Sequence, residues 1–297
     1  MKQFWLDLKN SALQFGQHKI PRLAAALAYY TVFSLAPLLI IVIGVIGLVY
    51  GTEDARQQLV AQLELRVGAD SAGLIETMIE RTAETGAGVL ATFIGIATLL
   101  LGATTVFAQL QMAMNEIWDV PADRTGGIRH LLVMRLRGLG MVLLLGFLLL
   151  LSFILQAALN VVVSNFAGVL PGGAWLWYLL NLLLTLALVA VVFAGIFKVL
   201  PDVELQWRDV WRGALLTAIL FKIGEVLIGI YLGTSGANSA YGAAGSLVVL
   251  LLWIYFSAQI LLFGAEFTQV ETRRRKGGRK AGTPEGMAAG GEASSHD

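Results

Sequence analysis

Long uninterrupted runs of apolar residues dominate this sequence. Six of them are long enough to cross the hydrocarbon core of a bilayer, which is about 30 Å thick and needs about 20 helical residues. They cover residues 23–50, 88–118, 134–165, 174–200, 210–233 and 241–270. Short connections join the last five runs, which favours antiparallel neighbours. We therefore predict an all-α polytopic membrane protein, with a bundle of six transmembrane helices in a domain over residues 23–270.

Residues 1–22 follow a different pattern, in which apolar and polar residues recur with a helical period. The apolar positions on this face are Phe4, Leu8, Ala12 and Phe15. Lysines surround them, and a basic helix with an aromatic, apolar face is typical of the membrane interface. We predict an interfacial amphipathic helix over 1–22; a solvated N-terminal helix is the alternative.

Two further segments are too polar to cross a membrane. Residues 51–87 contain many charged side chains, with apolar residues at helical spacing on both sides of Gly68. This pattern predicts two short amphipathic helices, forming an extracytoplasmic insertion between the first two spans. Residues 271–297 contain few apolar residues and several basic ones, so we predict a disordered, basic cytoplasmic tail.

Composition supports lipid as the solvent of the apolar runs. Hydrophobic residues make up 57% of the 297 residues, charged residues only 14%, and the mean hydropathy is +0.74. A soluble domain of this size is usually about a quarter charged. The chain has no cysteine, which excludes disulfides and thiolate metal sites, and its three histidines are dispersed. We therefore expect no metal and no other cofactor.

The lysines and arginines predict the orientation in the membrane. Four precede residue 23, four lie within 124–137, three within 198–212 and six within 273–280, all on one side of the predicted spans. The opposite side has three, all within 51–87. Because basic loops stay in the cytoplasm, both termini are predicted to be cytoplasmic. For a bacterial protein this corresponds to a multi-pass protein of the inner membrane.

Polar side chains inside the predicted spans are costly in hydrocarbon, so they need an explanation. The candidates for a polar cavity or substrate path are Tyr30, Ser34, Gln109, Asn115, Glu116, Gln156, Asn160, Gln259 and Glu266. One interpretation is that they line an internal cavity; the other is that they form hydrogen bonds between helices. Pro37 removes one backbone donor from the first span and is the predicted hinge.

Lys222 and Glu225 are the strongest candidates. They lie near the middle of the fifth span, and their spacing of three residues puts them on one helical face. A charge at this depth costs roughly 2.5–3.5 kcal/mol on insertion scales, so we expect them to be paired or hydrated. The sequence allows two roles for Lys222 and Glu225: a substrate or proton site, and a structural ion pair.

Four stretches of the sequence resemble a known family. They are LAYYTVFSLAPLL (27–39), NEIWDV (115–120), LPDVELQWRDVWRGA (200–214) and YLGTSGANSAYGAAGSLVVLLLWIYFSAQILLFGAEFT (231–268). They are similar to the YihY/BrkB family of bacterial inner-membrane proteins, and the likeness extends over about residues 10–270. The resemblance implies six spans and a cytoplasmic tail. It implies little about activity, because members have been labelled as ribonuclease BN, as serum-resistance virulence factors and as proteins that transport lipids.

The residues favour some classes of function over others. A ribonuclease needs a metal cluster or an acid–base pair in water, and a basic groove for phosphate. The sequence offers neither, so we expect no enzyme and no nucleic-acid partner. A transporter or flippase of lipids or amphipathic small molecules fits the polar span residues better, with membrane lipids as partners and anionic headgroups at the cytoplasmic face. The alternative is a scaffold or envelope-assembly factor that transports nothing. The sequence does not determine the substrate or the oligomeric state.

Overall fold

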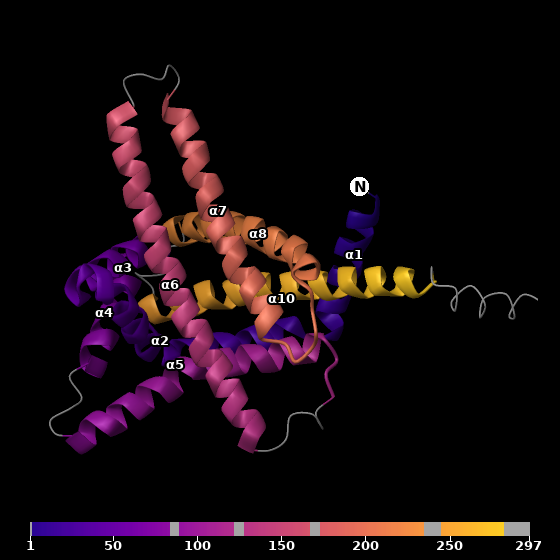
Figure 1. The fold of residues 1–297 in the computed structure, drawn as a ribbon, viewed down its shortest axis with the longest axis horizontal. Coiled ribbons are helices and arrows are strands. Elements are labelled where there is room, and N and C mark those ends of the chain that lie inside the picture. The colour runs from indigo at the N-terminus through magenta and orange to yellow at the C-terminus, as the bar shows by residue number, and fades with distance from the viewer. Residues whose placement is uncertain (1, 84–88, 122–127, 167–172, 235–244, 282–297) are drawn as a thin grey trace, which may run out of the picture.

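The computed structural model describes residues 2–83, 89–121, 128–166, 173–234 and 245–281. These residues fold into helices, with no strand among them (Figure 1). The helices are α1 (Lys2–Gln17), α2 (Ile20–Tyr50), α3 (Thr52–Val67), α4 (Ala69–Ala83), α5 (Val89–Ile117), α6 (Ile128–Phe166), α7 (Gly173–Val199), α8 (Trp207–Thr234) and α10 (Gly245–Ala281). The predicted all-α class is therefore confirmed.

Each predicted span corresponds to one long helix: α2, α5, α6, α7, α8 or α10. Among the described residues, four stretches are long and apolar enough to cross a membrane. These are Ile20–Val49, Arg135–Leu155, Leu179–Val199 and Leu247–Arg275. The count of six spans stays a prediction.

The centre of the molecule is built from α2, α5, α8 and α10. Helix α2 packs along α5, and α10 packs against both α2 and α8. Ile46 of α2, Met114 of α5 and Leu262 of α10 are fully buried in the apolar core that these helices share. Gly102 of α5 lies against the ring of Pro37, since a Cβ at Gly102 would be 2.8 Å from Pro37 Cγ. The predicted hinge residue thus lies at the contact between α2 and α5, inside an unbroken helix.

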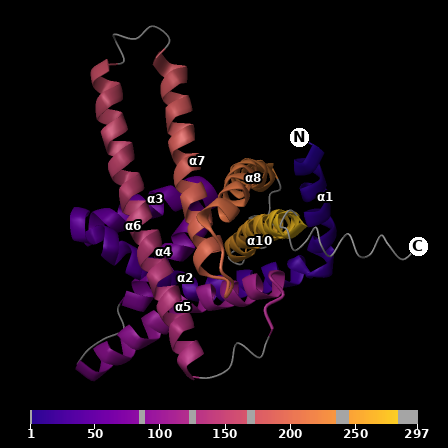
Figure 2. The same ribbon diagram turned by 45° about the vertical axis from the view of Figure 1, so that its right-hand side comes forward.

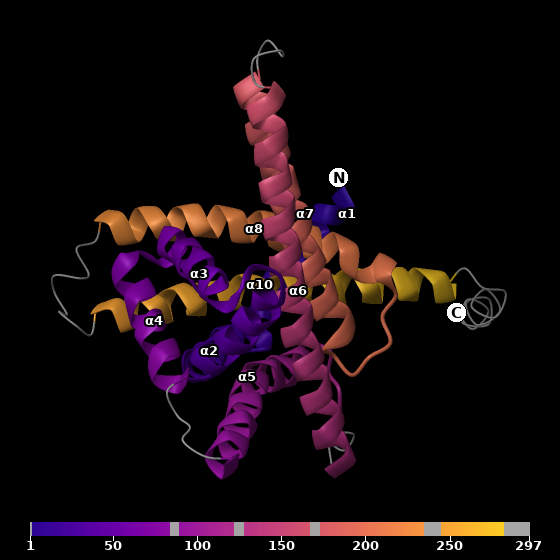
Figure 3. The same ribbon diagram turned by 60° about the vertical axis from the view of Figure 1, so that its left-hand side comes forward.

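Helices α6 and α7 form a hairpin that crosses the other long helices steeply and extends beyond them (Figures 1 and 3). The view in Figure 2 shows the same arrangement, with α6 and α7 upright beside α8 and α10. The prediction of a single bundle of antiparallel neighbours is therefore wrong for this hairpin. A short connection makes α6 and α7 antiparallel to each other, but it does not fix the angle at which the hairpin packs on the rest.

The predicted insertion over 51–87 contains the two short helices expected there, α3 and α4. They pack on each other and on α2, and α4 also contacts α10. Leu59 and Ile75 are buried in these contacts, while Arg56 bonds to Glu76 and Glu80 at 3.1 Å each. Residues 84–88 lie outside the described residues.

Both ends of the chain differ from the sequence-based boundaries. The N-terminal helix ends at Gln17, and its aromatic residues Phe4 and Phe15 contact Phe267 and Phe263 of α10. Helix α10 continues to Ala281, so the first eleven residues of the predicted disordered tail are helical. Ion pairs hold the start of this extension: Arg273 with Asp119, Arg274 with Asp7 and Arg275 with Asp209. The rest of the predicted tail, residues 282–297, lies outside the described residues.

Candidate functional site

A charged pair lies in the middle of α8. Lys222 Nζ donates a hydrogen bond to Glu225 Oε2 over 3.0 Å. The side chain of Lys222 is 39% exposed and that of Glu225 is 17% exposed, so the carboxylate is the more enclosed group. The predicted pairing on one helical face is confirmed. Pairing lowers the cost of placing both charges in an apolar surrounding.

An apolar groove of about 730 Å³ lies between α8 and α10. Its lining consists of Phe15, Leu220, Ile223, Gly224, Leu227, Ile228, Leu252, Phe256, Gln259, Ile260 and Phe263, and we call it the α8–α10 groove. The amide of Gln259, one of the predicted site residues, supplies the polar atoms of this lining. A cavity of this size and apolar character is suited to a hydrophobic ligand. The α8 residues of the lining, Leu220, Ile223, Gly224, Leu227 and Ile228, follow a helical period on one face, and Lys222 and Glu225 lie on the opposite face of α8.

Next to the groove, α8 and α10 approach each other through two glycines. A Cβ at Gly213 of α8 would collide with Thr268 Oγ1, and a Cβ at Gly264 of α10 would collide with Thr217 Oγ1. Each threonine hydroxyl donates to a carbonyl of its own helix: Thr217 to Gly213 and Thr268 to Gly264, both at 2.7 Å. Small residues of this kind let two helix backbones pack closely. They fix the distance between the helices that form the groove.

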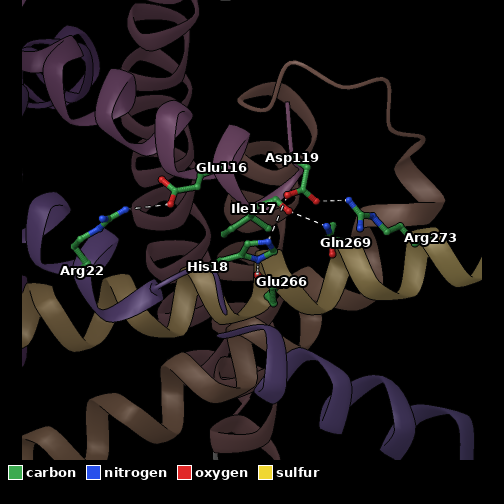
Figure 4. A network of polar contacts seen from close by, with 8 residues as sticks. All are labelled: His18, Arg22, Glu116, Ile117, Asp119, Glu266, Gln269 and Arg273. Atoms are coloured by element: carbon green, nitrogen blue, oxygen red, sulfur yellow. Dashed lines mark hydrogen bonds and ion pairs between the residues drawn. The ribbon is translucent and has the colours of Figure 1, made fainter. Parts of the chain in front are cut away.

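Polar residues from three segments meet where α10 passes the α1–α2 turn and the end of α5 (Figure 4). We call this set the polar junction, and it consists of His18, Arg22, Glu116, Asp119, Glu266, Gln269 and Arg273. Glu266 Oε2 lies 2.9 Å from His18 Nδ1, and its side chain is fully buried. His18 Nε2 lies 3.6 Å from Asp119 Oδ1. Asp119 also accepts a hydrogen bond from Arg273 at 2.6 Å.

The remaining contacts of the junction tie the end of α5 to its neighbours. Gln269 Nε2 donates to the backbone carbonyl of Ile117 at 2.8 Å, and Arg22 donates to Glu116 at 3.3 Å. Asp119 of the junction and Lys19, which follows His18, both have φ of 50°. A left-handed backbone costs a residue with a Cβ about 1–2 kcal/mol, so surrounding contacts must hold it in place. The predicted site residues Glu116 and Glu266 are both in this junction, with separate partners: Arg22 for Glu116 and His18 for Glu266.

A second polar cluster surrounds Asp202, a residue that sequence reasoning missed. Asp202 Oδ2 accepts hydrogen bonds from Asn115 Nδ2 at 2.8 Å and from Gln111 Nε2 at 3.0 Å, and Arg137 donates to the other carboxylate oxygen. The backbone N–H of Asp202 donates to Asn115 Oδ1 at 2.9 Å. The loop between α7 and α8 is thereby fastened to α5 and α6.

Burial of the Asp202 carboxylate acts to raise its pKa, but hydrogen bonds from Asn115 and Arg137 and the charge of Arg137 outweigh it. The pKa of Asp202 is therefore lower than that of an ordinary aspartate. An open pocket of about 680 Å³ adjoins this cluster, with Lys198, Glu204 and Gln206 in its lining. The signal for Asp202 was present in the sequence: Gln111 and Asn115 lie four residues apart on one helical face, and they needed a partner.

The other predicted site residues are not brought together into one path. Tyr30 is 40% exposed and packs on Tyr29 at the outward face of α2, whereas Ser34 is buried. Gln109 is partly buried. Gln156 and Asn160 lie in α6, but their side chains fall outside the described part of the structure.

The centre of the molecule contains a cavity of about 220 Å³, and its lining is apolar except for two hydroxyl side chains. Representative members are Leu110, Phe193 and Trp253, and the hydroxyls belong to Thr31 and Ser257. None of the predicted site residues is in this lining. The prediction that these residues line a polar cavity or a substrate path stays a prediction. Polar groups on different helices bond to separate partners, and large apolar side chains pack between them.

Within the described residues, no group of three or more His, Asp or Glu side chains is arranged to hold a metal ion.

Long apolar helices with exposed apolar faces, enclosed ion pairs and an apolar groove define an α-helical membrane protein. Its sequence matches the family described as "Virulence factor BrkB" over residues 12–288. The chain belongs to this family, as its resemblance to YihY/BrkB proteins indicated.

Relatives of this chain support the same class. It is 30% identical over 259 residues to the UPF0761 membrane protein PSPA7_4558 of Pseudomonas paraeruginosa, an alignment that covers 86% of this chain and 60% of the relative. It is 29% identical over 263 residues to a UPF0761 membrane protein of Xanthomonas oryzae, covering 85% of this chain and 57% of the relative. The chain thus spans about three fifths of the length of these relatives.

A third relative has a different name. The chain is 24% identical over 274 residues to the ribonuclease-like protein YfkH of Bacillus subtilis, covering 91% of this chain and 96% of that protein. No solved structure matches this chain.

Proposed function

We propose that the protein is a transporter or flippase that moves lipids, or amphipathic small molecules like them, in the bacterial inner membrane. The observation that supports this proposal is the α8–α10 groove, because it offers an apolar binding surface of about 730 Å³. Acyl chains fit the apolar lining. The Lys222–Glu225 pair lies on the opposite side of α8, so it is a separate candidate for contact with the polar end of an amphipathic molecule.

The proposed path follows the surface of the protein and does not cross its centre. Ile223 and Leu227 line the groove and are half or more exposed, so the groove is open to the surrounding lipid. The central cavity is smaller and apolar, and it offers no hydrophilic route for a headgroup. A lipid that keeps its chains in the groove would need only its headgroup to pass along α8.

We also propose six spans with both termini in the cytoplasm. The support is the charge distribution of the sequence and the length of α5 and α8, which contain 29 and 28 residues. In the structure the α6–α7 hairpin crosses α2 and α10 steeply, so this topology requires the hairpin to turn until it lies along them in the membrane (Figure 1). Single cysteines placed in loop 166–173 and in the tail would measure it. Labelling of the loop only from outside, and of the tail only from inside, is the expected result.

The experiment that tests transport uses the purified protein in liposomes with a panel of fluorescent lipids. Leu227→Trp fills the groove with a bulky side chain and is expected to reduce lipid movement at least tenfold. Val226→Trp is the matched control, because Val226 is 54% exposed on the same turn of α8 but is not in the groove lining. Equal rates in the two variants would show that the groove takes no part.

The charged pair is tested separately by Lys222→Leu/Glu225→Leu, which removes both charges together. We expect lipid movement to be lost while insertion and expression stay at the wild-type level. Normal movement in this double variant would remove the pair from the mechanism and leave the groove as the remaining candidate.

A scaffold or envelope-assembly factor is the second candidate. The polar side chains favour it in one respect: Asn115, Glu266 and Gln269 bond to groups on other segments of the chain, as expected for a rigid structural element. Absence of lipid movement from wild-type liposomes, for every lipid in the panel, would favour this function. We further propose that the chain is not a nuclease, since its histidines are dispersed and it has no cysteine.

A further inference from the structure

Helix α1 is oriented in a way that its sequence did not indicate. Its polar residues Asp7 and Ser11 are buried, with 3% and 0% of their surface exposed. Asp7 lies 2.9 Å from Arg274 of α10. His18, in the turn after α1, contacts Glu266. The side of α1 that carries Asp7 and Ser11 therefore faces the protein, as do the rings of Phe4 and Phe15, which contact Phe267 and Phe263.

The opposite side of α1 is exposed and largely apolar. Trp5, Leu6 and Leu13 are 68%, 57% and 61% exposed, and Lys9 is exposed between them. Trp5, Lys9 and Leu13 are four residues apart, so they form a row along the helix. We call these four residues the outer face of α1. In water, the three large apolar side chains of this face would lack a favourable solvent.

The charge of this surface is positive. The acidic residue within α1 is Asp7, and its carboxylate is buried beside Arg274. Lys9 lies on the outer face, and Lys19 is exposed just beyond the end of the helix. An outward row of tryptophan, leucine and lysine matches a helix that lies in the headgroup region of an anionic bilayer.

The chain also places α1 at the membrane. Only two residues separate its last residue, Gln17, from Ile20, where the apolar stretch Ile20–Val49 begins. Figures 1 and 2 show α1 at the edge of the molecule, crossing α10 near its C-terminal half and away from the α6–α7 hairpin. A helix in this position reaches the bilayer surface at the point where α2 enters it.

We propose that the outer face of α1 docks on the surface of an anionic lipid bilayer. Trp5, Leu6 and Leu13 insert at the boundary between headgroups and acyl chains. Lys9 and Lys19 interact with lipid phosphates. The side of α1 that carries Asp7 stays bound to α10, as does His18 in the turn that follows. This docking does not depend on the α8–α10 groove, so it holds whether or not the protein moves lipids.

The absence of cysteine from the sequence makes a direct test possible, because a single introduced cysteine is the only site for a thiol-reactive spin label. Leu13→Cys places the label on the outer face. Asn10→Cys is the matched control, since Asn10 is exposed on the same helix but outside that row. Each variant of the full chain is reconstituted in nanodiscs of phosphatidylcholine, with and without phosphatidylglycerol. Accessibility to oxygen and to a water-soluble nickel chelate is then measured.

The expected result is that the Leu13 label is reached better by oxygen than by the nickel chelate, and that phosphatidylglycerol increases this difference. The Asn10 label should be reached by nickel in both membranes. Lys9→Glu/Lys19→Glu should abolish the effect of phosphatidylglycerol on the Leu13 label.

Two results would overturn the proposal. Equal access of nickel to both labels would place the outer face in water. Protection of the Leu13 label from both reagents would mean that a protein surface, such as a second copy of the chain, covers it. Because the labels lie at exposed positions, each variant should keep the melting temperature of the parent protein.

Discussion

Two segments of α10, which we call its apolar half (residues 247–263) and its polar half (residues 264–272), differ in polarity and in burial. Residues 247–263 are almost entirely apolar, yet many are partly exposed; Phe256, for example, is 43% exposed. Residues 264–272 contain five polar side chains, and all nine residues of this segment are buried. In a water-soluble protein the order would be reversed, with apolar residues inside and polar ones outside. This reversal indicates that lipid, and not water, surrounds the apolar half.

The two halves also differ in what holds them. The apolar half gains little from leaving lipid, because lipid tails are as apolar as the protein interior. The polar half is held by specific partners: His18 to Glu266, Gln269 to the carbonyl of Ile117, and Arg212 to Glu271 at 2.7 Å. We therefore expect substitutions in the polar half to have large effects and those in the apolar half small ones. Four substitutions test this contrast, from the largest expected effect to the smallest.

The largest effect is expected from Gly264→Val. Any side chain at this position collides with Thr217, so α8 and α10 must move apart. Overpacking of this severity is expected to destabilise the protein by at least about 3 kcal/mol. The measurement is the fraction of folded protein in detergent by size-exclusion chromatography. Gly140→Ala is the control, because nothing lies within 4 Å of a Cβ there. Equal recovery of both variants would contradict the close approach of the two helices.

His18→Ala should come next. It leaves the buried carboxyl group of Glu266 without the imidazole 2.9 Å away, and leaving a buried polar group without its hydrogen-bond partner costs about 1–3 kcal/mol. Unfolding in a denaturing detergent measures the loss. The double variant His18→Ala/Glu266→Gln should recover part of it, since a neutral amide needs no counter-charge. Additive effects of the two substitutions would mean that the residues do not interact.

Asp202→Asn should have a smaller effect that depends on pH. The pKa of Asp202 is lowered in the folded protein, so the ionised carboxylate contributes stability above the ordinary aspartate pKa. This contribution is lost as the pH falls through the lowered value. The melting temperatures of wild type and variant should therefore differ near neutral pH and converge in acid. A difference that is constant between neutral and acidic pH would contradict an ionic role.

The smallest effect is expected from Leu247→Ala in the apolar half. Leu247 is 39% exposed, and its loss removes few contacts within the protein. We expect a change of about 0.5 kcal/mol or less, as is usual for surface positions. Unfolding in a denaturing detergent provides the value. A loss as large as that of His18→Ala would remove the contrast between the two halves of α10.

Much of the fold could be predicted from the sequence alone. Every apolar run longer than about 20 residues became one helix, because a backbone in an apolar surrounding must satisfy its hydrogen bonds internally. The helices of the 51–87 insertion and the pairing of Lys222 with Glu225 were also predictable, since both follow from helical periodicity. These features depend on residues within about four positions of one another.

The candidate site was less predictable, because its contacts join residues far apart in the sequence. Glu266 was identified as a costly buried acid, but its partner His18 lies 248 positions away. Asn115 was identified as a polar residue in a span, whereas Asp202, which it binds, was missed. A pattern shows that a polar group needs a partner, but only the packing of helices decides which partner it finds.

The sequence by itself determined that the chain is helical and apolar, and roughly where each helix begins and ends. Only the tertiary structure decided that α6 and α7 cross the other helices, that α10 continues past residue 270, and that α1 turns its polar side inward. The physical reason is the separation along the chain between the residues that decide each feature. Helix formation is a local property of the backbone, whereas crossing angles and buried ion pairs depend on the shapes and charges of surfaces that meet only after the chain has folded.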